Sequence, residues 1–227
     1  MAHEPLFGLG PHTMYKYGFA LESEFEQFDG AWYNTSELLY GITADWAITL
    51  AAAYPLETGT TPTIWALRTK YRFYREDMPG ASKQAALHGG IFLSPDGAQN
   101  RYDYFLGLSY GYESRRHYFF SGLRYRVNNN FSNIARADIA YGIRPWLLEY
   151  LQPDPVFLIE LNGRTNFAKA AASESSTYVL GFSPGLLFSY RNVMFKTGIM
   201  IPFIYDGNTK PPNELIVGLE YHFPPIY

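Results

Sequence analysis

Two ladders of charged residues are the part of this sequence whose types and spacing could do chemistry. Each ladder occupies every second position of its segment: Glu22, Glu24 and Glu26 in the first, and Arg68, Lys70 and Arg72 in the second. Alternate residues of a β-strand share a face, so each ladder presents one sign of charge to one side. Neighbouring carboxylates could exchange protons with a substrate, but same-face residues of a strand lie about 7 Å apart. Lining a polar space is therefore the favoured interpretation.

The composition argues against several other functions. Lys and Arg (18) nearly balance Asp and Glu (21), giving a net charge of −3, so nothing favours nucleic acid as a partner. The absence of Cys excludes disulfides and thiolate chemistry. The five His are scattered without an H-x-H pair, so we expect no metal and no cofactor. No apolar run is long enough for a transmembrane helix, and MAHEPLFGLG does not have the pattern of a signal peptide.

Period-two alternation recurs from end to end, whereas helical periodicity is nearly absent. It predicts strands at 13–28, 31–42, 46–54, 63–75, 83–93, 102–112, 116–127, 134–144, 155–165, 176–190, 193–204 and 213–223. Each has about the ten residues that a tilted strand needs to cross a bilayer. The sequence therefore predicts an all-β fold. We expect a closed antiparallel transmembrane β-barrel of about 12 strands with short turns at 13–227, after a periplasmic segment at 1–12.

The two faces of the predicted strands differ in a way that favours a membrane barrel over a soluble barrel or sandwich. In 102–112, one face has aromatic residues at both ends of an aliphatic middle: Tyr102, Tyr104, Leu106, Leu108, Tyr110 and Tyr112. This pattern is typical of a membrane-spanning strand, because aromatic residues favour the two membrane–water interfaces and aliphatic residues favour the hydrocarbon between them. The opposite face mixes Gly and Ala with charged residues, which suits the crowded interior of a closed barrel.

Charged residues on the second face then line the lumen. Acidic positions concentrate on the first two strands and the last one, and basic positions on the fourth, seventh and eighth, so we expect one negative and one positive wall. The lumen or selectivity candidates are Glu22, Glu24, Glu26, Glu37, Arg68, Lys70, Arg72, Arg124, Arg126, Arg136, Asp138, Glu160, Lys196 and Glu220.

Several stretches of the chain resemble one family of bacterial outer-membrane barrels, the putative "MetA-pathway of phenol degradation" family, often labelled transporter. The stretches are FGLGPHTMYKYGFALESEFE, KYRFYREDMPGASKQAALHGGIFL, ELNGRTN, FSPGLLFSYRNVMFKTGIMIP and VGLEYHF. The resemblance implies an outer-membrane location and the passage of small molecules. It supplies no site residues, and the family's name does not establish a phenolic substrate. The last stretch also resembles the C-terminal signal read by the barrel-assembly machinery.

We therefore expect an outer-membrane channel for passive passage of small polar or charged solutes through a charge-lined lumen, and not an enzyme. The expected partners are the lipid bilayer, lipopolysaccharide, the barrel-assembly machinery during biogenesis and an unidentified small solute. Two alternatives stay open. One is a closed barrel that is plugged by salt bridges or depends on a partner. The other is a lipid-facing enzyme using His117 and Ser121, although about 13 Å along the strand separates them.

Overall fold

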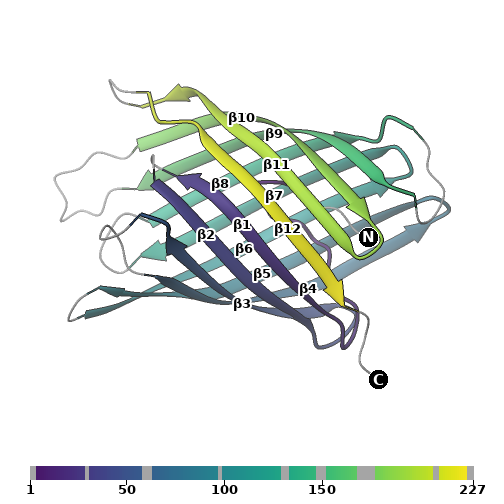
Figure 1. Cartoon of the computed structure of the whole chain (residues 1–227), viewed down its shortest axis with the longest axis horizontal. Coiled ribbons are helices and arrows are strands. Elements are labelled where there is room, and N and C mark those ends of the chain that lie inside the picture. The colour runs from purple at the N-terminus through teal and green to yellow at the C-terminus, as the bar shows by residue number, and fades with distance from the viewer. Residues whose placement is uncertain are drawn as a thin grey trace.

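The computed structural model describes residues 4–28, 31–57, 63–96, 99–128, 133–146, 152–167, 177–206 and 210–223. These residues form twelve strands joined in one closed ring (Figure 1). In chain order they are β1 (Phe19–Phe28), β2 (Ala31–Gly41), β3 (Trp46–Pro55), β4 (Ile64–Met78), β5 (Ala81–Asp96), β6 (Gln99–Ser114), β7 (His117–Asn128), β8 (Asn133–Ile143), β9 (Asp154–Phe167), β10 (Thr177–Tyr190), β11 (Val193–Tyr205) and β12 (Glu214–Phe223). The all-β barrel and its twelve strands are confirmed. No helix in the described ranges is long and apolar enough to cross a membrane.

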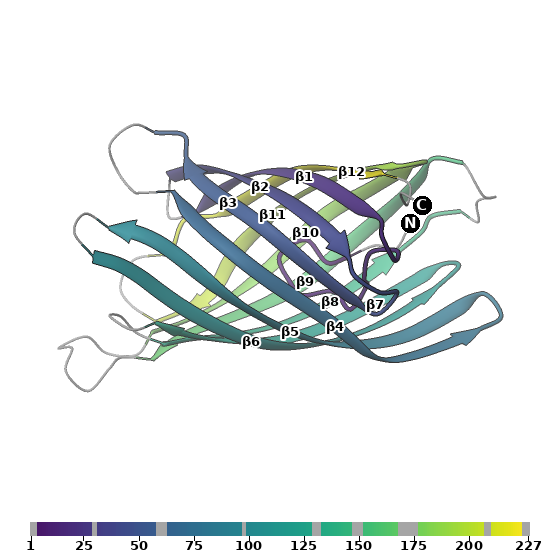
Figure 2. The same ribbon diagram turned by 90° about the horizontal axis from the view of Figure 1, so that it is seen from below.

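The ring closes through antiparallel pairing of β1 with β12, in a register that runs from Phe19 opposite Phe223 to Gln27 opposite Leu215. Closure matters because an open sheet edge in lipid would leave backbone N–H and C=O groups without partners. We call the end at which β1 begins and β12 ends the proximal end, and the opposite end the distal end. The strands are strongly tilted between these two ends (Figure 2).

Exposed apolar side chains cover the outside of the barrel. On β6, Leu106 is 74% exposed, whereas Phe105 on the opposite face is 5% exposed. The same alternation places large aliphatic and aromatic side chains outward on many strands, including Leu21, Leu50, Leu67, Leu87, Leu123, Ile139, Phe157 and Leu219. Soluble proteins rarely expose apolar surface on this scale, and a bilayer is the solvent that suits it.

Polar residues on the outward face of β1 and β2 bond to one another. Asn34 is 3% exposed and donates from Nδ2 to the Ser23 hydroxyl at 3.0 Å. The Ser36 hydroxyl donates to Asn34 Oδ1, also at 3.0 Å. Because polar groups facing hydrocarbon are costly when unbonded, this cluster makes three polar side chains compatible with an apolar exterior.

The first strand begins later than the alternation predicts, at Phe19 rather than at residue 13. Tyr17 has a φ of 61°, and its N–H donates to the Gly41 carbonyl at 2.7 Å. Gly41 is required at this turn, since a Cβ there would lie 2.0 Å from the Tyr15 carbonyl oxygen. The turn breaks the strand pattern and redirects the preceding residues into the barrel.

Candidate functional site

The N-terminal residues from Glu4 to Met14, here called the inner segment, lie inside the barrel lumen (Figure 2). The sequence predicts a periplasmic segment at residues 1–12. In the structure, residues 4–12 pack against inward-facing side chains of the wall, and residues 1–3 lie outside the described ranges. The proximal half of the lumen is therefore occupied by the chain itself.

An apolar cluster holds one side of the inner segment. Leu6 is 4% exposed and packs among inward-facing apolar residues of the wall, with Phe7 against the same cluster. The wall residues of this cluster are Tyr118, Phe120, Ala140, Val156, Leu158, Leu187 and Ile216. Burial of one Leu side chain stabilises this docking by about 2 kcal/mol.

Glycines in the wall make room for the inner segment. A Cβ on Gly198 or Gly185 would lie 2.6 Å or 2.1 Å from the Leu6 Cδ1 atom. A Cβ on Gly111 would lie 2.7 Å from the Pro11 ring, and one on Gly107 would lie 2.7 Å from Leu9. Such distances are below van der Waals contact, so a larger side chain would displace the segment or itself. These inward-facing glycines form a cradle for the inner segment.

Glu160 on β9 fixes the tip of the inner segment. Its carboxylate is fully buried and accepts hydrogen bonds from the backbone N–H of Leu6 and, at 3.1 Å, of Phe7. Asn162 donates to the same carboxylate at 3.4 Å. A buried carboxylate needs such donors because its desolvation is costly. Glu160 therefore faces the lumen and binds the backbone of the inner segment there.

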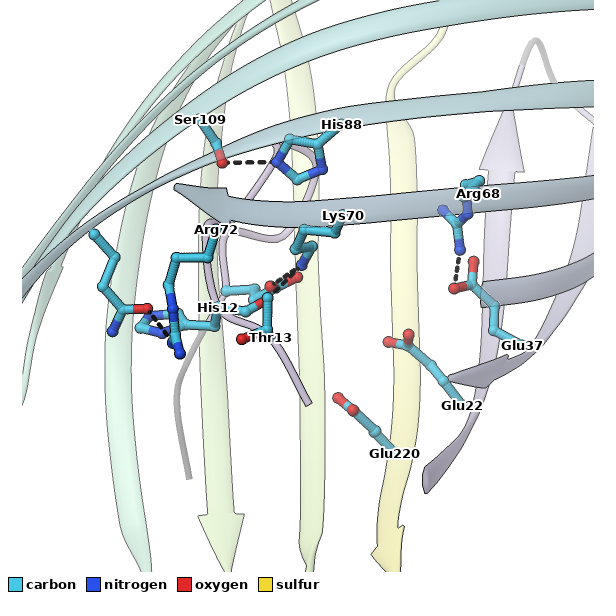
Figure 3. Close-up of polar contacts among 12 residues, drawn as sticks. His12, Thr13, Glu22, Glu37, Arg68, Lys70, Arg72, His88, Ser109 and Glu220 are labelled. Atoms are coloured by element: carbon cyan, nitrogen blue, oxygen red, sulfur yellow. Dashed lines mark hydrogen bonds and ion pairs between the residues drawn. The ribbon is translucent and has the colours of Figure 1, made fainter. Parts of the chain in front are cut away.

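Lys70 holds the other side of the inner segment. Its ammonium donates to the His12 carbonyl oxygen at 2.8 Å and forms an ion pair with Glu4 (Figure 3). The His12 ring lies edge-on to Phe120, with centroids 5.9 Å apart, and its Nε2 is 3.5 Å from a Glu113 carboxylate oxygen. Contacts from β4, β6 and β7 thus converge on one backbone segment.

The two other members of the basic ladder have different roles. Arg68 forms an ion pair with Glu37 of β2 along the wall (Figure 3). Arg72 is 7% exposed and donates to Asp45 Oδ1 at 2.6 Å, to the Ala44 carbonyl at 2.7 Å and to Gln84 at 2.9 Å. Arg72 therefore secures the turn between β2 and β3, and it does not present a free charge to the lumen.

The acidic ladder is also divided. Lys196 on β11 lies 2.8 Å from a Glu22 carboxylate oxygen and forms a second ion pair with Glu24. Glu26, nearest the distal end, makes no hydrogen bond or ion pair within the described ranges. Two ladder carboxylates are thus neutralised along the wall, and one is left facing the lumen.

The remaining candidates lie on the inner wall. Arg126 pairs with Asp103 of the adjacent strand, and its guanidinium stacks 4.3 Å from the Phe92 ring centroid. Glu220 lies 2.8 Å from His222 on its own strand. Arg124 and Arg136 are directly opposite each other on β7 and β8. Most ion pairs therefore join nearby strands and do not bridge opposite walls.

Asp138 lies beside the tip of the inner segment. A Cβ on Gly8 would be 3.2 Å from the Asp138 Cβ, and the Asp138 carboxylate accepts a hydrogen bond from the Leu9 backbone N–H. A cavity of about 40 Å³, enough for roughly one water molecule, lies next to this contact. Its lining includes Phe7, Arg136, Asp138, Asn162, Arg164 and Glu214. The tip of the segment thus separates an occupied proximal half from a charged distal half.

His117 and Ser121 have no catalytic arrangement in the described structure. The His117 Nδ1 atom lies 2.7 Å from the Tyr141 hydroxyl, and the two rings are stacked with centroids 6.0 Å apart. A hydroxyl nucleophile needs a base within hydrogen-bond reach. The His117 imidazole is instead hydrogen-bonded to the Tyr141 hydroxyl on the outer surface of the barrel.

Reasoning from sequence alone missed the inner segment. A signal was present in the inward-facing apolar residues at the proximal ends of β7, β9 and β10, such as Phe120, Leu158 and Leu187. A water-filled lumen would not favour them, so they indicate that something apolar packs there. The apolar stretch PLFGLGP before the first strand is the matching partner.

The fold is similar to solved outer-membrane porins. The KdgM porin matches with a TM-score of 0.57 and 10% identity over 90% of this chain and 99% of that one. The NanC porin matches with a TM-score of 0.54 and 12% identity over 89% and 98%. OccAB2 of Acinetobacter baumannii matches with a TM-score of 0.51 and 8% identity over 89% of this chain and 59% of that one. The chain therefore has the fold of these porins, a closed twelve-stranded antiparallel β-barrel, with an apolar exterior.

No family model and no curated protein matches the chain. The finer resemblance to the phenol-degradation family is therefore not confirmed. At 8–12% identity the solved structures establish the fold alone.

Proposed function

We propose that this chain is an outer-membrane channel for small polar or charged solutes, and that the inner segment restricts the passage. One observation carries the proposal: a lumen with a charged distal half ends on a segment that is docked by non-covalent contacts only. The inner segment belongs to no strand, so it can leave the lumen without breaking the barrel. A solute would pass beside the segment or after its displacement.

Other properties of the barrel support the same function. Its apolar exterior suits a bilayer, and we propose that this bilayer is the outer membrane. Lipopolysaccharide would then contact the distal part of the barrel. The barrel-assembly machinery would be the partner during biogenesis. Twelve strands lie between the eight that leave room only for side chains and the sixteen or more that leave a wide channel. A narrow passage for small solutes fits this size.

A reversible covalent lock tests whether the inner segment controls the passage. The chain has no Cys, and the Cβ positions at Gly8 and Asp138 are 3.2 Å apart, near the roughly 3.8 Å of a disulfide. The double variant Gly8→Cys/Asp138→Cys is reconstituted in planar bilayers. We expect the oxidised double variant to have a low single-channel conductance. Addition of a thiol reductant should raise this conductance to that of the Asp138→Cys single variant. Asp138→Cys alone is the control and should not respond to the reductant.

A closed barrel with a structural or partner-dependent role is the second candidate. The packing of the proximal lumen favours this candidate. Glu160 and Lys70 bond to the inner segment there, and Leu6 packs in the apolar cluster of the wall. Absence of conductance in both the parent and the reduced double variant would support this candidate and reject the channel. Equal, measurable conductance in the oxidised and reduced forms would show that the barrel is a channel and that the inner segment does not control it.

A further inference from the structure

Three charged side chains in the distal half of the lumen have no partner among the residues that the structure describes. Glu26 on β1, Arg124 on β7 and Arg136 on β8 make no hydrogen bond or ion pair with any residue in the part of the chain that the structure describes. Their side chains are partly exposed to solvent. The other charges nearby are engaged: Arg126 with Asp103, Arg68 with Glu37, Arg164 with Glu214 at 3.6 Å, and Lys196 with Glu22 at 2.8 Å.

The three groups face one shared space from opposite walls. In the ring of twelve strands, β1 and β7 are six steps apart, so Glu26 and Arg124 are on opposite walls. Arg136 and Arg124 are among the charges whose fields act on the Glu26 carboxylate, yet neither forms an ion pair with it. A gap therefore separates a single negative group from a pair of positive groups.

The two guanidiniums place like charges side by side on the wall. Arg124 and Arg136 are directly opposed on adjacent antiparallel strands, and like charges in this position repel each other. The low effective dielectric of a narrow lumen strengthens the repulsion. A carboxylate placed between them would remove it and could accept paired N–H donors from each guanidinium.

The wall supplies only part of that negative charge. The Asp138 carboxylate, two residues along β8 from Arg136, attracts both guanidiniums at a distance but forms no ion pair with either, and it accepts a hydrogen bond from Leu9 of the inner segment. A simple anion in the gap would also face Glu26 and Asp138, and both would repel it. A ligand that carries an ammonium group as well as a carboxylate satisfies both walls at once.

We propose that the distal lumen binds small zwitterionic solutes, with the ligand's carboxylate on Arg124 and Arg136 and its ammonium on Glu26. A free amino acid with a small uncharged side chain has this chemistry. The proposal deepens the channel function and rests on it, because a site on the path sorts solutes as they pass. Binding at such a site should be weak enough to allow release.

Isothermal titration calorimetry of the full chain in detergent micelles tests this site without requiring conduction. The probes are L-alanine, L-lactate, in which a hydroxyl replaces the ammonium, and ethylamine, which lacks the carboxylate. We expect L-alanine to bind about tenfold or more tightly than either of the others, because each loses a charge-assisted contact. Glu26→Gln should weaken L-alanine binding about tenfold without weakening lactate binding. Arg124→Gln and Arg136→Gln should weaken both.

The matched control removes a neighbouring ion pair that the proposed site does not use. Asp103→Asn/Arg126→Gln changes two lumen charges at no change in net charge and should leave L-alanine affinity within about twofold. Each variant is first checked for the folded barrel by its retained β-sheet circular dichroism. The proposal would be overturned if L-alanine and lactate bind with equal affinity and Glu26→Gln leaves both affinities unchanged. The site would then bind anions without recognising the ammonium group.

The result for this site can be separated from that for the channel. Absence of L-alanine binding up to its solubility limit in a parent that conducts overturns the zwitterion site and leaves the channel standing. Binding with the expected responses in a parent that does not conduct supports the site and rejects the channel.

Discussion

The Glu160 carboxylate accepts a 3.1 Å hydrogen bond from the backbone N–H of Phe7 and a second from the adjacent N–H of Leu6. The carboxylate is on β9, more than 150 residues away in sequence, and it is fully buried. Each partner depends on the other. Without the inner segment the carboxylate would lose its main donors, and without the carboxylate two buried N–H groups would be left unbonded.

Replacing Glu160 by Gln should loosen the inner segment. An amide offers one acceptor oxygen and one NH₂ group, so a donor would face one of the two backbone N–H groups. We expect hydrogen exchange in the peptide covering residues 4–14 to become about tenfold faster or more, from the loss of a charge-assisted bond. Glu220→Gln is the control, since Glu220 bonds to His222. Unchanged exchange in the Glu160 variant would show that this contact does not hold the segment.

Adding one methyl group to the glycine cradle should have a similar effect. A Cβ at Gly111 would lie 2.7 Å from Pro11 Cγ and 3.0 Å from a Phe120 ring carbon, so Gly111→Ala forces the Pro11 ring away. Pro11→Ala removes the clashing ring atoms and should restore segment protection in the double variant. Hydrogen exchange in the two single variants and the double variant measures the coupling free energy between positions 11 and 111. If the double variant is no better protected than Gly111→Ala, the clash lies within the wall itself.

The facing of β6 leads to a prediction about lipid contact. Leu106 is the most exposed large apolar side chain in the described ranges, at 74%, and should lie near the middle of the bilayer. Leu106→Arg should lower the free energy of unfolding by about 2–4 kcal/mol, measured by urea titration in lipid vesicles. Leu106→Ala should cost much less, because it adds no charge. Equal stability of the Arg variant and the parent would mean that this position does not contact hydrocarbon.

Arg72 and Arg75 on β4 provide a matched pair for stability. Arg72 is 7% exposed and bonds to Asp45, Ala44 and Gln84, whereas the Arg75 side chain is 49% exposed beside Asp77. Arg72→Gln should lower the free energy of unfolding by about 3 kcal/mol, because several charge-assisted bonds are lost. Arg75→Gln should change it by less than about 0.5 kcal/mol, as for other exposed ion pairs. Urea unfolding in vesicles measures both, and similar values for the two would contradict this assignment.

The sequence predicted the barrel because strand facing depends only on local alternation. Each strand carries its own signal, as the exposed Leu106 and buried Phe105 of β6 illustrate, so twelve separate signals add to one fold. The start of β1 was misplaced by six residues, whereas the other strand ends differ by at most three. The alternation of Tyr15, Tyr17 and Phe19 continues through a turn that a positive φ creates.

The site was less predictable because pairing depends on distance across the lumen, which parity does not give. Parity grouped Arg68, Lys70 and Arg72 as one basic ladder, but each has a different partner in the structure. Lys196 belonged to no ladder, and it neutralises part of the acidic one. The inner segment has no periodicity at all, and its position depends on side chains that come more than a hundred residues later.

Displacing the inner segment should open the passage. Leu6 is 4% exposed within an apolar cluster, so Leu6→Asp would place a charge among Phe120, Leu158 and Leu187. Burying an unpaired carboxylate costs several kcal/mol, more than the roughly 2 kcal/mol that the Leu side chain contributes, and the segment should leave the lumen. We expect the single-channel conductance in planar bilayers to rise severalfold, because the proximal half of the lumen then fills with water. Tyr15→Ser is the control: Tyr15 is 65% exposed outside the inner segment, so the parent conductance should persist. A Leu6→Asp barrel that folds, shows rapid exchange in residues 4–14 and still conducts as the parent does would place the permeation path elsewhere.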